Sequence, residues 1–409
     1  MSDADKQLAG ISLPKDFEFG AVPSIPHRGV LHLLTNPSLG PIAGFAGSWM
    51  GNGFNTIFRP NSQKTPTAMP GPVTSLSPKD NVLELNLTSE SLTFTDSLGT
   101  VPNRGSGTQE DIKLNGLSYL QTIQDITIPG HPVGIHVEPG LWMVVPATSI
   151  PNQAEQTVVR MASIPHGTTI QAQGTAKENN GPPNIPAVDI TPFFTPNGAK
   201  FRFDSQTATN NGTLRIPQDL TSFIAAGSIT QAMLDDPNSV LRDAIAHQTI
   251  IGYTQIDVAI PPQPLPPPLP PPPPPPVPPL IGGGADNIGF LIGDVTQPLP
   301  KQPNAQVLSM SATFYIEKVE HTIVIPIFHP GQPPLILRPE QRVIGQPTPS
   351  FTVTPPKAIP SPIKIKFRTT QIQYTQTVML NFAGLTWPHV SVATLVPASP
   401  IPIPTHPWP

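Results

Sequence analysis

The chain has 409 residues, a formal net charge of −4, no cysteine and 60 prolines, 15 of which fall between positions 261 and 279. The lack of cysteine excludes disulfides, thiolate metal sites and cysteine nucleophiles, and a total of only 22 Lys and Arg residues argues against nucleic-acid binding. Because proline interrupts helices and sheet ladders, we expect short segments with many turns rather than long helical bundles.

The sequence also lacks features of membrane insertion and secretion. It contains no apolar run of roughly 18 residues, the length that a membrane span needs. Its N-terminal residues do not show the basic and then apolar pattern of a signal peptide. We therefore expect a cytoplasmic protein without a membrane span.

Strand signals dominate the first part of the chain. Residues 1–40 are irregular, and residues 40–59 are apolar and glycine-rich around Trp49. After a loop at 60–80, apolar and polar residues alternate with the period of two that is typical of strands. Short runs of this kind are bounded by Gly, Pro or Asn, which favours antiparallel hairpins; the runs are 82–98, 117–128, 133–146, 157–163 and 168–173.

A polar, turn-rich insertion at 174–211 precedes a helical region at 228–248. Ser228 fits the N-cap of a first helix, with Gln231 as the third helical residue. Asp236-Pro237-Asn238 interrupts the pattern, and Ser239 can cap a second short helix over 240–248. We expect a small helical pair that closes one end of a barrel.

The proline stretch at 261–284 must adopt an extended polyproline II conformation. It is typical of a stiff excursion between two strands, and it also fits the ligand of a polyproline-binding protein. Strand-like runs return after it, at 307–316, 319–328, 351–354, 363–369, 374–382 and 390–396.

The fold class is therefore all-β. About ten strands are divided between the two sides of the proline stretch, and closing the sheet into an antiparallel barrel leaves no exposed edges. We predict one barrel built from residues 41–260 and 285–397, with residues 1–40 as an irregular N-terminal segment and 398–409 as a proline-rich tail.

The first chemically distinctive segment surrounds Trp49. Gly47, Trp49, Gly51 and Gly53 share one face of a strand, because side chains alternate with a period of two. Glycines there allow another backbone or a flat ligand to approach closely. Packing alone is also a sufficient reason for Gly and Trp in the first strand of a barrel.

The second segment contains His136 and Glu138, which also share a face. On the inner face of a barrel they fit a polar anchor, an acid–base pair or two metal ligands. No third ligand lies nearby in the sequence, so a zinc site is not favoured. Mutual hydrogen bonding of a buried pair is the simplest interpretation.

The third segment begins at His389, which alternates with Ser391, Ala393 and Leu395 on one face of a strand. The small side chains leave room for a planar ligand beside the imidazole. A neutral imidazole in this position can bind haem iron.

Together these segments resemble the nitrobindin-like haem-binding barrels, which are related to fatty-acid-binding proteins and lipocalins. The resemblance covers about 150 of 409 residues in four separate segments. They contain Gly47, Trp49, Gly51, Gly53 and Thr56-Ile57; His136, Glu138 and Gly140; Pro165, Gly167, Thr168 and residues 170–174; and Met379 with Pro388-His389. The chain departs from the family in the polyproline stretch and in a long insertion before the last segment.

The resemblance implies haem b as cofactor, with His389 as the axial ligand of the iron and Thr56 in contact with the haem. Ile57, Gly51, Gly53 and His136 would line the same site. The longer form resembles proteins described as haem-binding and peroxidase-like, which implies chemistry with peroxide or reactive nitrogen species at an open iron position.

Peroxidase chemistry requires a distal base and a cation or donor. Arg160 and His166 are the candidates, and His136 and His321 are also available. The competing function is a non-enzymatic carrier of haem or NO, or a haem-free binder of an apolar small molecule. All of these functions share a small-molecule partner.

Overall fold

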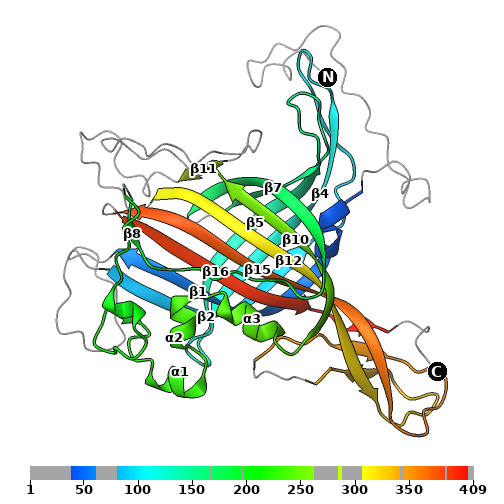
Figure 1. Cartoon of the computed structure of the whole chain (residues 1–409). Coiled ribbons are helices and arrows are strands. Elements are labelled where there is room, and N and C mark those ends of the chain that lie inside the picture. The colour runs from blue at the N-terminus through cyan, green and yellow to red at the C-terminus, as the bar shows by residue number, and fades with distance from the viewer. Residues whose placement is uncertain are drawn as a thin grey trace, which may run out of the picture. The chain divides into compact units, whose positions relative to one another are not determined.

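The computed structural model describes residues 38–60, 81–164, 167–195, 197–261, 284–287, 306–340, 345–382 and 385–403. Ten antiparallel strands of this part pair in a closed ring, which confirms the predicted barrel (Figure 1). The ring runs through β4 (Ile112–Asp125), β5 (Val133–Val145), β6 (Thr157–Ser163), β7 (Thr168–Asn180), β10 (Thr249–Ile260), β12 (Gln306–Ile325), β15 (Ile363–Phe382), β16 (Leu385–Pro397), β1 (Gly47–Pro60) and β2 (Asn81–Phe94). Pairing of β2 with β4 closes it.

Strands from the two sides of the proline stretch are neighbours in this ring. β10 pairs with β12 from Thr249↔Glu320 to Ile260↔Met310, and β1 pairs with β16 from Trp49↔Pro397 to Thr56↔Val390. The barrel wall therefore needs both halves of the sequence.

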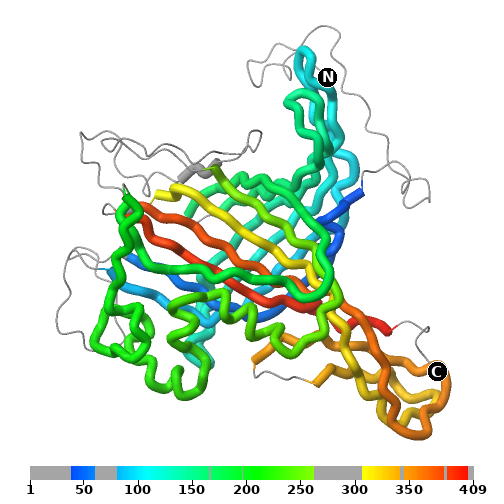
Figure 2. Tube along the Cα trace, viewed as in Figure 1, coloured from blue at the N-terminus to red at the C-terminus, as the bar shows by residue number. Residues whose placement is uncertain are grey.

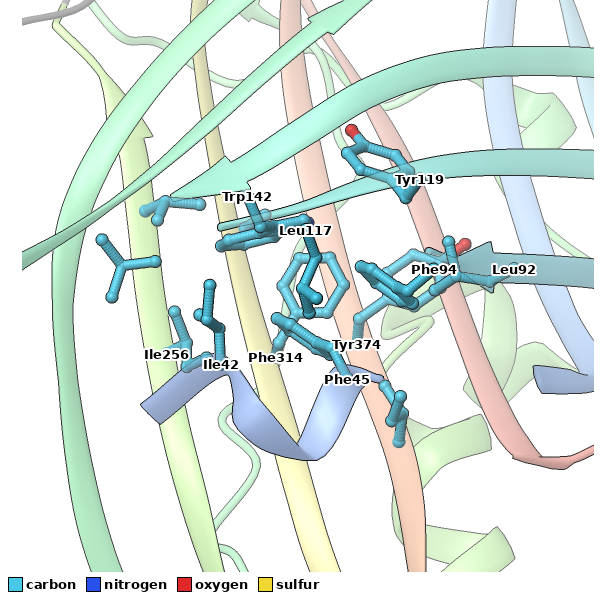
Figure 3. Close-up of a cluster of buried hydrophobic side chains, with 14 of the residues drawn as sticks. Ile42, Phe45, Leu92, Phe94, Leu117, Tyr119, Trp142, Ile256, Phe314 and Tyr374 are labelled. Atoms are coloured by element: carbon cyan, nitrogen blue, oxygen red, sulfur yellow. The ribbon is translucent and has the colours of Figure 1, made fainter. Parts of the chain in front are cut away.

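A short 3-10 helix, η3 (Gly40–Phe45), closes the end of the barrel at which β1 begins. Figure 3 shows Ile42 and Phe45 pointing from η3 into the apolar core between the strands. The Phe45 ring stacks on the Phe94 ring with centroids 5.0 Å apart. The backbone carbonyl of Phe45 accepts a hydrogen bond of 2.7 Å from the indole N–H of Trp49. Trp49 and η3 thus seal this end together.

The segment between β7 and β10 forms a layer on the outside of the barrel. It contains β8 (Phe193–Phe194), η4 (Asp204–Gln206), β9 (Arg215–Ile216), α1 (Thr221–Ala226), α2 (Gln231–Asp235) and α3 (Ser239–Ile245). Figure 2 shows the backbone of this segment beside the barrel wall. Its buried residues, such as Leu234 and Leu241, pack with Phe54, Leu85 and Val392 on the outer face of β1, β2 and β16. The prediction that helices close one end of the barrel is therefore wrong, because their apolar faces cover its wall.

The predicted helix starts are shifted. Thr230, not Ser228, is the N-cap of α2, and its hydroxyl accepts a hydrogen bond of 3.4 Å from the amide of Met233. Ser228 instead lies at the end of α1, where its amide and its hydroxyl both donate to the carbonyl of Phe223. The second helix begins at Ser239 but ends at Ile245, with Asn238 at the N-cap.

β12 and β15 each span 20 residues, and they continue beyond the η3 end of the barrel (Figure 1). There they pack against a small sheet of β13 (Leu335–Leu337), β14 (Phe351–Val353) and β17 (Ile401–Pro402), around a core that includes Ile323, Phe328 and Phe351. Two minor strands, β3 (Val101–Asn103) and β11 (Gly284–Asn287), pair with β4 and β7.

Several element boundaries differ from the predictions. The runs at 307–316 and 319–328, and likewise 363–369 and 374–382, belong to single strands β12 and β15. β7 continues to Asn180, so the first residues of the predicted 174–211 insertion are strand. β10 and α1 were not predicted, and the proline stretch lies largely outside the described residues. No helix in the described ranges is long and apolar enough to cross a bilayer.

Candidate ligand-binding site

The inner surface of the barrel becomes polar toward the end opposite η3, which we call the mouth. The strands β1, β2, β4, β5 and β16 carry polar inward side chains there: Asn55, Thr88, Glu90, Gln121, His136, Glu138, Ser391 and His389. The facing strands stay apolar, with Ile170, Ala172, Val258, Ile260, Met310 and Ala312. The inner surface of the mouth half thus has a polar wall on one side and an apolar wall on the other.

Arg160 on β6 is the centre of one polar network. Its guanidinium donates to Glu138 Oε1 over 2.5 Å, to the Tyr119 hydroxyl over 3.0 Å and to Gln376 Oε1 over 2.6 Å. The Tyr119 hydroxyl, which points away from the apolar cluster in Figure 3, also donates to Glu138. Glu138 and Arg160 are almost completely buried, and each compensates the charge of the other.

Burial alone raises the pKa of Glu138, but the Arg160 guanidinium and the hydrogen bond with His136 hold that pKa at about 2. Burial lowers the pKa of Arg160, and the Glu138 carboxylate more than reverses this, so the pKa lies above its usual value. Both groups are therefore charged at neutral pH. His136 Nε2 lies 3.1 Å from Glu138 Oε2, so the predicted hydrogen-bonded pair forms, with Glu138 buried and His136 partly exposed.

Glu90 on β2 is the centre of a second network. Its carboxylate accepts hydrogen bonds from the Tyr374 hydroxyl (2.6 Å), the Thr88 hydroxyl (3.0 Å) and Gln121 Nε2 (3.3 Å). Burial raises the pKa of Glu90 to about 7, although these hydrogen bonds and the nearby His136 oppose the shift. This carboxyl can therefore gain or lose a proton near neutral pH.

His389 lies near the start of β16, with its imidazole on the inner face. Its Nε2 is 2.9 Å from Asn55 Nδ2, and the same amide nitrogen donates to Ser391 Oγ over 2.7 Å. An amide nitrogen can only donate, so His389 Nε2 is the unprotonated acceptor nitrogen of the ring. The acceptor lone pair of Nε2 is thus directed at the Asn55 amide, on the inner face of the barrel.

The glycines of β1 allow the neighbouring strand to approach. A Cβ atom at Gly51 would lie 2.0 Å from the carbonyl oxygen of Thr394, and one at Gly53 would lie 2.1 Å from that of Val392. Of the two interpretations from the sequence, close approach of another backbone therefore accounts for both glycines.

Thr56 and Ile57 lie on opposite faces of β1. Thr56 is fully buried and pairs with Val390 in the outer layer, so its side chain is separated from His389 by the barrel wall. Its hydroxyl has no hydrogen-bond partner among the described residues. Ile57, two residues after Asn55, shares the inner face of His389.

The remaining histidines lie elsewhere. His321 is beyond the η3 end, where it is hydrogen-bonded to Thr369 Oγ1 over 2.9 Å, and burial lowers its pKa to about 4. His247, His131 and His329 are exposed. His166 lies outside the described residues, as do His27, His32 and His406. No group of three metal-ligating side chains occurs in the described ranges.

The sequence did not predict Asn55, Glu90, Gln121, Tyr119 and Tyr374 as site residues. Their signal was the strand alternation itself, because a polar residue at an inward position of a closed barrel must find a partner inside it. Glu90 and Tyr374 are 284 positions apart, so only the closure of the barrel identifies them as partners.

The chain was compared with protein-family models, curated proteins and solved structures. The chain matches no protein-family model, no curated protein and no solved structure.

Proposed function

We propose that the protein binds a small, largely apolar ligand in the mouth half of its barrel, anchored by His389. The observation that supports this most strongly is the unprotonated His389 Nε2 on the inner face. Opposite the polar wall, small apolar residues such as Ala172 and Ala312 bound the same interior. An apolar surface with a few convergent polar groups is the usual character of a small-molecule site.

Haem b is the ligand that the resemblance to nitrobindin-like barrels suggests. His389 fits an axial ligand, since its Nε2 can exchange the Asn55 hydrogen bond for iron, and Ser391 and Ala393 beside it are small. Thr56 does not fit a haem contact, because its side chain faces the outer layer. When bound, a haem with one protein ligand would supply an open iron position for a small oxidant or NO.

We favour a carrier over a peroxidase. Arg160 is buried and already donates to Glu138, Tyr119 and Gln376, so its guanidinium is not free to stabilise charge on a ligand. Peroxide-dependent oxidation of a dye by the haem-loaded protein tests this choice. Turnover that disappears in Arg160→Met, with haem content preserved, would favour the enzyme instead.

The binding site is tested by filling it. Ala312→Phe places a ring on the inner face of β12, whereas Ala259→Phe on β10 adds the same ring between the inward residues Val258 and Ile260, facing outward. We expect haemin titration to give a Soret band with the wild type and with Ala259→Phe, and at least about tenfold weaker binding to Ala312→Phe.

Two outcomes of this titration tell us separately where the ligand binds and whether it is haem. Equal haemin affinity of Ala312→Phe and the wild type would contradict binding inside the barrel. If haemin gives no Soret band but an uncharged fluorescent apolar probe binds the wild type and not Ala312→Phe, the ligand is apolar and haem-free.

A further inference from the structure

A cleft of about 690 Å³ lies outside the barrel at the η3 end. Its walls come from the end of η3 and the start of β1, from β15, and from the chain that follows β16. The side chains that matter for its chemistry are Trp49, Ile251, Lys318, Phe367, Arg368 and Ile401.

The cleft exists because the first residues of β15 extend beyond the last residues of its neighbour β16. β15 pairs with β16 only from Ile372 onward, whereas its pairing with β12 continues to Ile363. After Pro397, opposite Trp49, the chain turns away and β17 pairs with β14 instead. Within the described ranges, residues 367–370 of β15 therefore have a strand neighbour on one side only, and the cleft lies along the other.

The charge of the cleft is one-sided. Lys318 and Arg368 are its only charged lining residues, and they extend the inner faces of β12 and β15 past the barrel. Lys318 has no acidic partner in the part of the chain that the structure describes. Arg368 Nε is 3.6 Å from Glu320, whose carboxylate already binds Lys366 over 2.8 Å. Lys318 is thus without an ion pair in the described residues, and Arg368 shares one carboxylate with Lys366.

The rest of the lining is mainly apolar. The partly exposed side chains of Ile251, Phe367 and Ile401 supply its apolar surface, whereas Trp49, whose indole N–H donates to the Phe45 carbonyl, is almost completely buried in the barrel core. A smaller neighbouring cleft shares Lys318 and Arg368 and contains Glu178, whose carboxylate accepts a hydrogen bond of 2.5 Å from Thr254. Glu178 thus offsets part of the charge of the two cations, and the three side chains together keep a net positive charge.

We propose that this cleft binds a small amphiphile with an anionic head group, whose charge lies between Lys318 and Arg368. The apolar part of the ligand lies against Phe367 and Ile401. The volume is within the range of small-molecule sites, about 300 to 1,000 Å³. This site is separate from the barrel mouth and does not depend on haem binding.

The test uses dansyl-labelled undecanoic acid and its methyl ester, with energy transfer from tryptophan as the readout. We compare the wild type with Lys318→Gln/Arg368→Gln and with Lys113→Gln/Lys357→Gln, which removes the same charge at exposed positions away from the cleft. We expect the first double variant to bind the acid about tenfold more weakly, with unchanged binding of the ester, and the control to match the wild type.

Dodecyl phosphate is then added as a competitor of the labelled acid. If it displaces the acid, the site accepts a phosphate as well as a carboxylate head group; if it does not, the site prefers a carboxylate. Both results agree with an anionic ligand. Unchanged affinity of the Lys318/Arg368 variant for the acid would overturn the proposal, as would an equal loss of acid and ester. Loss of the labelled acid in Ala312→Phe, with Lys318→Gln/Arg368→Gln unaffected, would place the ligand in the barrel instead.

Discussion

Glu90 is a buried carboxyl whose hydrogen-bond partners, Tyr374, Thr88 and Gln121, are neutral. Its burial therefore determines how it contributes to stability. Its pKa rises through burial from 4.5 to about 7 on folding. Between these two values the folded chain binds the proton more tightly than the unfolded chain, so stability falls as pH rises through this window. Above about pH 7 the cost of burying the carboxylate is complete.

We predict that Glu90→Gln removes most of this pH dependence. Its free energy of unfolding should exceed that of the wild type by about 2 kcal/mol at about pH 8, and the difference should shrink toward about pH 5. Urea unfolding at the two pH values measures this. A variant that is less stable than the wild type at the higher pH would show that the ionised Glu90 stabilises the barrel.

Arg160 and Glu138 form the opposite case, a buried pair of full charges. Arg160→Met leaves the Glu138 carboxylate buried without its cation, and we expect a loss of about 3 to 5 kcal/mol. Arg104 and Asp111 provide the control, because they form an ion pair of 2.6 Å that is largely exposed. Arg104→Met should cost less than about 1 kcal/mol. Equal losses in the two variants, measured by urea unfolding, would contradict this assignment.

At the scale of elements, η3 is expected to contribute much more than its length suggests. Phe45 is completely buried and contacts Phe94, Trp142 and Phe314 with ring centroids 5.0 to 5.6 Å apart. Phe45→Ala should destabilise the barrel by about 3 to 5 kcal/mol, through lost burial and the cavity that remains. Phe201→Ala, at a position that is 45% exposed, is the control. A thermal midpoint for Phe45→Ala equal to that of this control would show that η3 does not close the core.

Strand existence was more predictable than strand length. Alternation in β2, β4 and β5 shows in the sequence because one face of each meets the barrel core. β12 and β15 were predicted as two pieces each because they pass from the barrel core to the separate core around Ile323, Phe328 and Phe351, where different residues become buried. β10 was missed because it stands between the helical region and the proline stretch, both of which suggested other structure.

At the scale of the whole molecule, the ladder between β10 and β12 joins the two halves of the sequence. We predict that a Gly/Ser linker of equal length can replace residues 262–283 without loss of haemin binding, because polyproline II has no internal hydrogen bonds. The Soret band and the thermal midpoint should match those of the wild type. Loss of haemin on replacement would show that the proline stretch contributes to the site.

The sequence indicated a closed barrel and placed His136 with Glu138, and His389 with Ser391, on common faces. It did not indicate that Thr56 faces an outer layer, because only the packing of α2 and α3 against β1 and β16 buries that face. Partners such as Gln376 for Arg160 depend on strands far apart in the sequence. They follow from the ring order rather than from any local pattern.

The most direct test of the central proposal, that His389 anchors the ligand, is the ferric visible spectrum of haemin-loaded protein. His389→Ala is compared with His321→Ala, which alters a histidine beyond the η3 end. We expect the first variant to lose or shift the Soret band and the second to keep the wild-type band. A wild-type spectrum and haem content in His389→Ala, with loss in His321→Ala, would contradict the proposal.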